Sequence, residues 1–430
     1  AQTSCAGDDG GDVLATAGAD FPVRLEAVVW ESGNDGDDDG IPDSNQAVKD
    51  NALTPNFGNE GATVDLSHTL AAPGGGSPGN LSGATGIGGF AGGGETVTAV
   101  AWSEVGIINL DAGLSNTNGY LGSGDDVTGA VPNLGRFKPA DFLVEVREPG
   151  MYEATCDSTF SYVGEAFGYA MQPMLDITAR NANSPPATTE NYRGSFIKLA
   201  ADDVDVTPPE EDASAIGKAG DLVDVTASPS PSLGVGDVDD DGDSDALGNG
   251  VIVYTFDSGD TYTYSKVHNA RITPFTADLR ITVDDVTDDD GVTDASLPSP
   301  NPFTPDGVQI RYGRLALDNA FGPETLPLVI PMRAEYWDGN RFVLNEEESG
   351  FMTSECWQYN PSGKEVDGSE VELVPGSVAN NISADDTFGL DMGRPDQGMD
   401  RGEPDSDDGR IWLKSKSDEL QPGDDREEGV

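Results

Sequence analysis

Two short stretches of the chain carry aspartates in the same order and spacing. Both read D-x-D-x-D-G-x-x-D, one over residues 35–43 and the other over residues 237–245. Carboxylates at the first, third and fifth positions converge on one point, the glycine allows the turn behind them, and the ninth position closes the cage, as in a calcium-binding loop. The spacing therefore predicts two Ca²⁺ sites, with the ligands Asp35, Asp37, Asp39 and Asp43 in the first loop and Asp237, Asp239, Asp241 and Asp245 in the second.

Neither loop is an EF-hand. At position 12, where an EF-hand has a bidentate glutamate, the loops have Gln46 and Gly248, and no amphipathic helix flanks either loop. This pattern is more typical of the calcium-binding loops of extracellular modules. The alternative for each loop is an acidic turn exposed to solvent, but two complete matches favour calcium.

A third acidic run follows at residues 288–294. Its candidate ligands are Asp288, Asp290 and Asp294, but Val286 occupies the first ligand position. The run is therefore either a third calcium site or a solvated turn.

Motifs typical of enzymes are missing from the sequence. The only histidines are His68 and His268, neither in a paired-ligand spacing, and there is no G-x-S-x-G nucleophile elbow. Glycoside hydrolases use a pair of carboxylates. Carboxylates are so abundant in this chain that two of them close together would be expected by chance and would not indicate such an enzyme. We expect a non-catalytic protein; a polysaccharide-active enzyme is the alternative and would need an acid–base pair in a cleft.

Tryptophans and cysteines offer a few further candidates. Trp357 and Trp412 lie in charged surroundings and are candidates for binding surface glycans, whereas Trp30 and Trp102 end apolar runs and are expected in cores. The three cysteines are too far apart in sequence for a zinc knuckle or a C-x-x-C redox pair. They are either buried thiols or include one long-range disulfide, for which Cys156 and Cys356 are the candidate pair.

The charge of the chain restricts its partners. Its 78 acidic and 23 basic residues give a formal net charge of −55. Nucleic acids and anionic membrane surfaces would be repelled, and divalent cations are the natural counter-charge. No run reaches the roughly 18 apolar residues of a membrane span, so we expect no membrane insertion. The first residues lack the regions of a signal peptide, so either a signal has been removed or the chain is part of a longer precursor.

Short apolar clusters between Gly, Pro, Asp and Asn predict β-strands throughout. Strands are expected at residues 21–30, 62–70, 95–102, 104–110, 151–163, 167–180, 192–200, 222–227, 250–256, 260–268, 276–286, 308–318, 326–337, 341–345, 370–374 and 410–414. Hairpins are predicted through residues 257–260 and through Asp338-Gly339. Residues 44–51 are the one helix candidate, and the glycine-rich stretch 73–94 predicts a flexible loop.

These patterns predict an all-β protein of serial Ig-like β-sandwich domains with inserted calcium-binding loops. The expected domains are residues 1–148, a sandwich with a calcium loop and the glycine-rich loop, and residues 149–297, a sandwich with the second calcium loop. Residues 298–430 are expected to form a β-rich domain with an irregular acidic C-terminal segment.

Several phrases of the sequence are similar to those of a known family. They include ALTPNFGNE at residues 52–60, GRFKPADF at 135–142, FSYVGEAF at 160–167, IRYGRL at 310–315 and PMRAEYWDGNRFVLN at 331–345. In this order they resemble the large uncharacterised C-terminal domain of MshQ-like proteins, which are associated with mannose-sensitive haemagglutinin type IV pili of Gram-negative bacteria. The resemblance implies a secreted or cell-surface protein tied to pilus function or adhesion, and it transfers no catalytic residues.

Two functions follow as expectations. The first is a calcium-stabilised, non-catalytic surface protein that acts with pilus components in adhesion. The second is a repeating subunit of an extracellular filament, in which copies of the chain are held together by strand pairing and calcium.

Overall fold

The computed structural model describes residues 9–37, 43, 48–91, 94–124, 126–155, 160–207, 222–226, 232–235, 249–266, 271–317 and 328–348, and beyond these the backbone of six short strands up to residue 413. The described residues form many strands in several sheets, which confirms the all-β prediction. The only helical elements among them are short 3-10 turns at Ser32–Asn34, Val48–Asp50, Tyr120–Gly122, Gly194–Phe196 and Ala201–Asp203.

The first unit consists of two sheets packed face to face. Its strands are β1 (Ala15–Thr16), β2 (Phe21–Glu26), β3 (Val64–Ala72), β4 (Leu81–Ser82), β5 (Glu95–Trp102), β6 (Gly106–Leu114) and β7 (Thr128–Lys138), in the orders β1-β7-β6-β3 and β2-β5-β4. Alternate residues point inward, so β2 and β5 contribute Phe21 and Trp102 while β7 contributes Phe137. The ring of Phe137 lies 5.2 Å from that of Phe21 and 5.0 Å from that of Trp102, which joins the two sheets.

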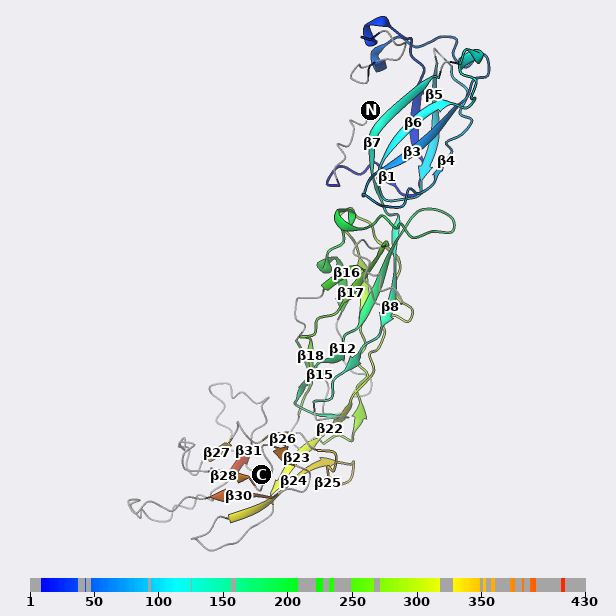
Figure 1. Cartoon of the computed structure of the whole chain (residues 1–430). Coiled ribbons are helices and arrows are strands. Elements are labelled where there is room, and N and C mark those ends of the chain that lie inside the picture. Colours follow the sequence, from blue (N-terminus) through cyan, green and yellow to red (C-terminus); the bar gives the residue numbers. More distant parts are fainter. Residues whose placement is uncertain are drawn as a thin grey trace.

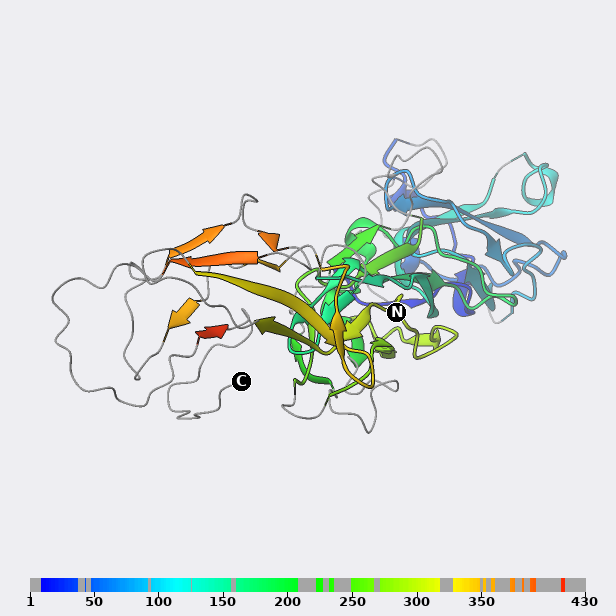
Figure 2. The ribbon, with the colours of Figure 1, turned by 90° about the horizontal axis from the view of Figure 1, so that it is seen from below.

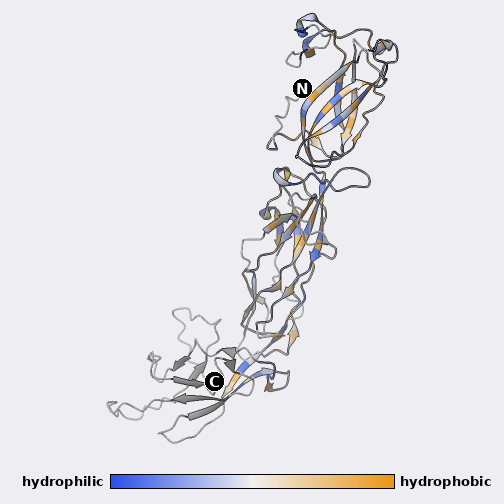
Figure 3. Cartoon of the chain, viewed as in Figure 1, coloured by the Kyte–Doolittle hydropathy of each residue, from blue (hydrophilic) through white to orange (hydrophobic). Residues whose placement is uncertain are grey.

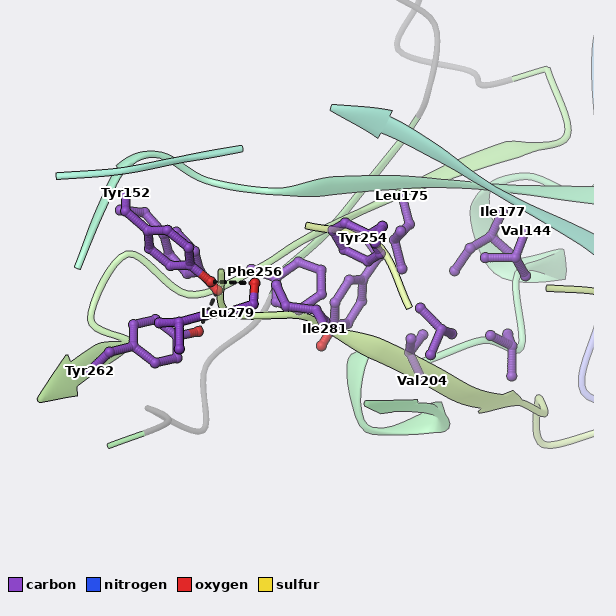
Figure 4. Close-up of a cluster of buried hydrophobic side chains, with 14 of the residues drawn as sticks. Val144, Tyr152, Leu175, Ile177, Val204, Tyr254, Phe256, Tyr262, Leu279 and Ile281 are labelled. Carbon is purple, nitrogen blue, oxygen red and sulfur yellow. Dashed lines mark hydrogen bonds between the residues drawn. The ribbon is translucent and has the colours of Figure 1, made fainter. Parts of the chain in front are cut away.

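The second unit holds most of the largest hydrophobic cluster among the described residues. Its strands are β8 (Asp141–Glu148), β9 (Met151–Tyr152), β10 (Phe160–Tyr162), β11 (Ala166–Phe167), β12 (Tyr169–Met171), β13 (Met174–Arg180), β14 (Val204–Thr207), β15 (Leu222–Thr226), β16 (Ser232–Val235), β17 (Val251–Thr255), β18 (Thr261–Tyr264), β19 (Phe275–Thr276), β20 (Thr282–Val286), β21 (Asp294–Ser296) and β22 (Gln309–Arg311). The central sheet has the order β16-β17-β13-β8-β21. Aliphatic side chains from β8 and β13 lie at one end of the core and tyrosines from β9 and β18 at the other (Figure 4).

The third unit begins where the second ends. Its strands are β23 (Gly313–Leu317), β24 (Leu328–Trp337), β25 (Phe342–Leu344), β26 (Phe351–Met352), β27 (Trp357–Tyr359), β28 (Glu372–Pro375), β29 (Asn381–Ile382), β30 (Thr387–Asp391) and β31 (Ile411–Leu413). The long strand β24 pairs with β23, β25 and β30. Only Tyr312 separates β22 of the second unit from β23 of the third, so the chain passes directly from one sheet into the next.

The three units follow one another end to end (Figure 1). Figure 2, seen from below, likewise separates the first unit from the third. Apolar residues lie mostly on the strands of the first two units, whereas the connecting loops are largely polar (Figure 3). The first and second units each have a hydrophobic cluster, and Trp337 and Phe342 of the third unit pack against the cluster of the second. Contacts at the junctions therefore fix one unit to the next.

Several strand predictions need correction. The hairpin through residues 257–260 is wrong, because β17 pairs with β13 and β16 whereas β18 pairs with β11 and β15. The strands belong to different sheets, with Tyr254 and Tyr262 buried in the same core. Residues 192–200 form no strand and contain a 3-10 turn at Gly194–Phe196.

One hairpin prediction is confirmed, whereas two strands of the fold were not predicted. The hairpin at Asp338-Gly339 is confirmed, since Trp337 pairs with Phe342. Strands β7 and β8 were not predicted. Gly129, Pro132 and Gly135 interrupt the pattern of β7, whereas β8 alternates as a strand does and was overlooked. The predicted border after residue 148 coincides with the end of β8, whereas the first sandwich ends at Lys138.

Candidate functional site

The first acidic loop is closed at its base by backbone hydrogen bonds. The amide of Asp43 donates to the carbonyl oxygen of Asn34 at 2.7 Å, and the amide of Gly36 donates to Asp43 Oδ2 at 3.0 Å. The side chain of Asn51 donates to Asn34 Oδ1 at 2.9 Å and holds the loop from the other side. These bonds bring the ninth loop position beside the first, where Asp35 is buried.

The described part of this loop has the oxygen donors that Ca²⁺ prefers. Asp35 and Asp37 each have further polar contacts in the structure, and Asp39 lies outside the described residues. In the second loop, Asp237, Asp239, Asp241 and Asp245 all lie outside the described residues. Within the ranges that are described, no three His, Cys, Asp or Glu side chains form a group that could hold a metal ion.

The third acidic run makes protein contacts at each candidate ligand. Asp288 is buried, accepting from the amides of Asp290 and Val292 at 2.9 Å each and from the Tyr192 hydroxyl at 2.9 Å. Asp294 Oδ1 accepts from the amide of Val286 at 3.2 Å. These separate contacts give the run a structural role in the turn between β20 and β21.

Asp290 of the same run joins the second unit to the first. It forms a two-pronged ion pair with Arg136 of β7, in which Nη2 donates to Oδ1 at 2.7 Å, and its carbonyl oxygen accepts from Lys138 Nζ at 2.7 Å. The Arg136 guanidinium holds the pKa of Asp290 below its usual value, whereas burial raises the pKa of Asp288. Both side chains of the ion pair are largely buried, so its geometry is fixed.

A second group of contacts at the first junction surrounds Glu104. Its buried carboxylate accepts from the amides of Asn191 at 3.2 Å and Glu190 at 3.4 Å, both in the second unit. The Asn191 side chain bonds the backbone of Ser77 twice, at 2.7 and 2.8 Å. Burial raises the pKa of Glu104 to about 7. The glycine-rich stretch was predicted to be a flexible loop, but it contains strand β4, which pairs with β5, and the contacts of Ser77 tie it to the second unit.

The junction between the second and third units is built around Arg311. Its guanidinium lies 4.2 Å from the ring centre of Phe160 and 4.8 Å from that of Tyr336, and it donates to Asn345 Oδ1 at 2.6 Å and to Glu347. This stacking crosses from the second unit to the third.

Tyr162 adds a second link across the same junction. Its hydroxyl donates to Glu348 Oε2 at 2.7 Å and accepts from Asn345 Nδ2 at 2.7 Å. Asn345 and Glu348 are both almost fully buried, so the interface has a polar network whose described groups are hydrogen-bonded.

The tryptophans divide differently from the prediction. Trp102 is fully buried, as expected, but Trp30 is wrongly assigned to a core because 49 % of it is exposed. It lies beyond the end of β2 and follows Val29, whose amide donates to the carbonyl oxygen of Ala52 at 2.7 Å. The backbones of Trp357 in β27 and Trp412 in β31 lie on paired strands, opposite Leu413 and Gln358 respectively.

Some candidates cannot be placed. Cys5, Cys156, Cys356 and His268 lie outside the described residues. His68 Nε2 lies 2.7 Å from the carbonyl oxygen of Pro78 and joins β3 to the glycine-rich loop. Among the helices of the described chain, none is long and apolar enough to cross a membrane.

The junction residues were missed as functional candidates, although the sequence carries a signal for some of them. Arg136 and Lys138 flank Phe137 in a chain where bases are few, so a basic pair around a buried aromatic indicates an acidic partner nearby. Nothing local in the sequence connects these residues with Asp290, because the contact depends on how two units pack.

Comparisons with known proteins place the chain in a family. Residues 1–104 match the second domain of DUF6701, residues 104–304 match the third and residues 311–428 match the fourth. A comparison with curated proteins gave no match. The border at residue 104 lies between β5 and β6, within the first sandwich, so the family borders do not follow the structural units. The chain therefore belongs to the DUF6701 family and carries the second, third and fourth domains of that family.

Proposed function

We propose that this chain is a non-catalytic, calcium-stabilised rod of an extracellular or cell-surface protein that acts with pili or related appendages, in adhesion. The observation that carries the proposal is the pair of junctions. At both of them, buried charged and polar side chains fix one β-unit to the next. A rod of fixed alignment can hold a binding surface at a distance from the cell.

Two sequence features support the extracellular and pilus assignments. The phrases that resemble those of MshQ-like proteins support an association with type IV pili, and the two D-x-D-x-D-G-x-x-D loops are typical of extracellular calcium modules. Such modules bind calcium at about 10⁻⁴–10⁻³ M. Calcium bound only by the folded chain would stabilise it by mass action.

Immunogold electron microscopy of intact source cells tests the location. Antibodies raised against the purified chain are expected to label the cell surface or its appendages, with pre-immune serum as the control. Labelling confined to the interior of sectioned cells would overturn the proposal.

The second candidate function, a repeating subunit of a filament, rests on one edge strand. β7 pairs with β1 only at Phe137 and Lys138, and Thr128–Pro132 are exposed, so this stretch has one described strand neighbour, β6. Negative-stain electron microscopy with millimolar calcium and with chelator separates the candidates. Filaments that form in calcium and dissolve in chelator would favour the subunit, whereas separate rods in both would favour the adhesion protein.

A further inference from the structure

One face of the sheet β23–β24–β25 combines arginines with aromatic rings. The register pairs Arg314 with Glu335 and Trp337 with Phe342, and residues two apart on a strand share a face. Arg271 of the second unit covers this face, with its guanidinium 4.8 Å from the ring centre of Trp337 and 4.9 Å from that of Phe342. We call this surface the arginine–aromatic face; it comprises Arg271, Arg314, Arg333, Glu335, Trp337 and Phe342.

This face is positive in an otherwise acidic chain. Three arginines and one glutamate give a local charge of 3 − 1 = +2. Glu335 serves both Arg314 at 2.7 Å and Arg333 at 3.5 Å, whereas exposed Arg271 forms no ion pair with any residue that the structure describes. A guanidinium stacked on a ring keeps its N–H edge available for carboxylates.

A complementary surface lies on the two-stranded sheet β14–β20. The register sets Asp205 directly opposite Asp285, and both are exposed, as are the nearby Asp202 and Asp284. Like charges directly opposite each other destabilise a sheet. Within the described chain, Asp285 accepts from the Thr287 hydroxyl at 2.7 Å, and neither Asp205 nor Asp285 is paired with a cation. We call Asp202, Asp205, Asp284 and Asp285 the acidic strip.

The two surfaces lie at opposite ends of the second unit. The acidic strip is close to the first junction, because β20 leads into the turn whose Asp290 pairs with Arg136. The arginine–aromatic face lies at the second junction, where Arg271 meets the β24–β25 hairpin. One molecule therefore cannot bring its own two surfaces together, and a contact between them joins two copies.

Building on the second candidate function, the repeating subunit, we propose that the arginine–aromatic face of one molecule docks on the acidic strip of a second copy. Because the two patches differ, the contact is head-to-tail and generates a staggered, open-ended row of molecules. At physiological ionic strength, screening over about 8 Å weakens the repulsion between the chains more than it weakens ion pairs in contact. Association is therefore strongest at intermediate salt.

Sedimentation equilibrium over a concentration series in physiological salt tests this contact. The wild-type chain is expected to show a weight-average mass that rises with concentration. The face variant R271E/R333E and the strip variant D205R/D285R, each alone, are expected to associate about tenfold more weakly, since several exposed charge pairs are reversed. The control R24E/R147E changes net charge as the face variant does, at two exposed arginines away from both surfaces, and should associate like the wild type.

Mixing the two variants is the most discriminating part of the experiment, because their charge reversals are complementary. In an alternating row, the acidic face of one variant meets the basic strip of the other, and the unchanged face meets the unchanged strip. Association is therefore expected to return in the mixture. Thermal melts verify folding, and the strip variant tests the contact independently if the face variant unfolds.

Three results would overturn the proposal. They are a wild-type chain that stays monomeric at every concentration, a face variant that associates as well as the wild type, and variants that fail to restore association when mixed. Binding of a polyuronate to the face by a chain that remains monomeric would assign the face to an acidic glycan and would also overturn the contact between copies.

Discussion

At the residue scale, scarce basic side chains hold the units together. Arg136 pairs with Asp290 across the first junction and Arg311 stacks between Phe160 and Tyr336 across the second. The chain has 23 basic and 78 acidic residues, so each arginine has several possible acidic partners. Burial and geometry therefore decide which ion pair forms. Exposed pairs such as Arg24–Glu26 contribute little by comparison.

Removing Arg136 should therefore be costly. R136A leaves the carboxylate of Asp290 largely buried without its ion-pair partner, and we expect about 3 kcal/mol of lost stability in urea denaturation. The matched variant R24A, at an exposed pair, should change stability by less than about 1 kcal/mol. Equal effects of the two substitutions would contradict the assignment of Arg136 to the junction.

Glu104 should make stability depend on pH. Burial raises its pKa in the folded chain to about 7, above the usual 4.5, with the charge of Glu190 adding to the shift. Stability contributed by this group is fully present below pH 4.5 and is lost as the pH rises through 7. The melting temperature of E104Q relative to the wild type should accordingly rise between pH 5 and pH 8. A difference that stays constant over this range would show that Glu104 does not titrate there.

At the element scale, close backbone packing sets where strands can meet. Gly313 of β23 lies against the ring of Tyr162, where an added Cβ would be 2.3 Å from the nearest ring atom. Gly113 of β6 has nothing within 4 Å of the same position. The two glycines therefore form a matched pair, one at the second junction and one on an open surface.

Gly313→Ala should loosen the second junction. The methyl group cannot fit beside Tyr162 without shifting it, so we expect a cost of about 1–3 kcal/mol, measured as a lower midpoint of urea denaturation. Gly113→Ala is expected to be neutral or mildly stabilising. If Gly313→Ala is also neutral, Tyr162 is not held as tightly as its bonds to Asn345 and Glu348 indicate.

The acidic loops predict a response to calcium. D37A/D39A should lower the melting temperature in millimolar calcium but not in excess chelator, because calcium stabilises the fold only when it is bound. Asp126→Ala, an exposed aspartate outside the loops, serves as the control and should respond equally in both conditions. An equal loss in calcium and chelator for the loop variant would exclude a metal role for Asp37 and Asp39.

The sequence predicts the elements better than it predicts their partners. Alternation reveals β2, β3 and β5, and Asp338-Gly339 predicts the β24–β25 hairpin, because these signals are local. The assignment of β17 and β18 to different sheets is not local, and it depends on tyrosines packing in a shared core. The junctions could not be predicted for the same reason, because their contacts join residues far apart in the sequence. In the sequence alone Asp290 is one member of an acidic run, and only the structure shows that it pairs with Arg136.

At the scale of the whole molecule, the β-units are held end to end by contacts at two junctions. The first junction is closed by Arg136, Glu104 and Asn191, and the second by Arg311 and Tyr162. Because these links are protein contacts, the alignment of the units should not require calcium. Calcium is expected to raise the melting temperature of the rod without changing its length.

Small-angle X-ray scattering of the dilute chain, in calcium and in chelator, tests this account most directly. We predict the distance distribution of a single elongated particle of fixed shape, with the same maximum dimension in both conditions. A compact particle, or a broad distribution typical of units moving independently about the junctions, would contradict it.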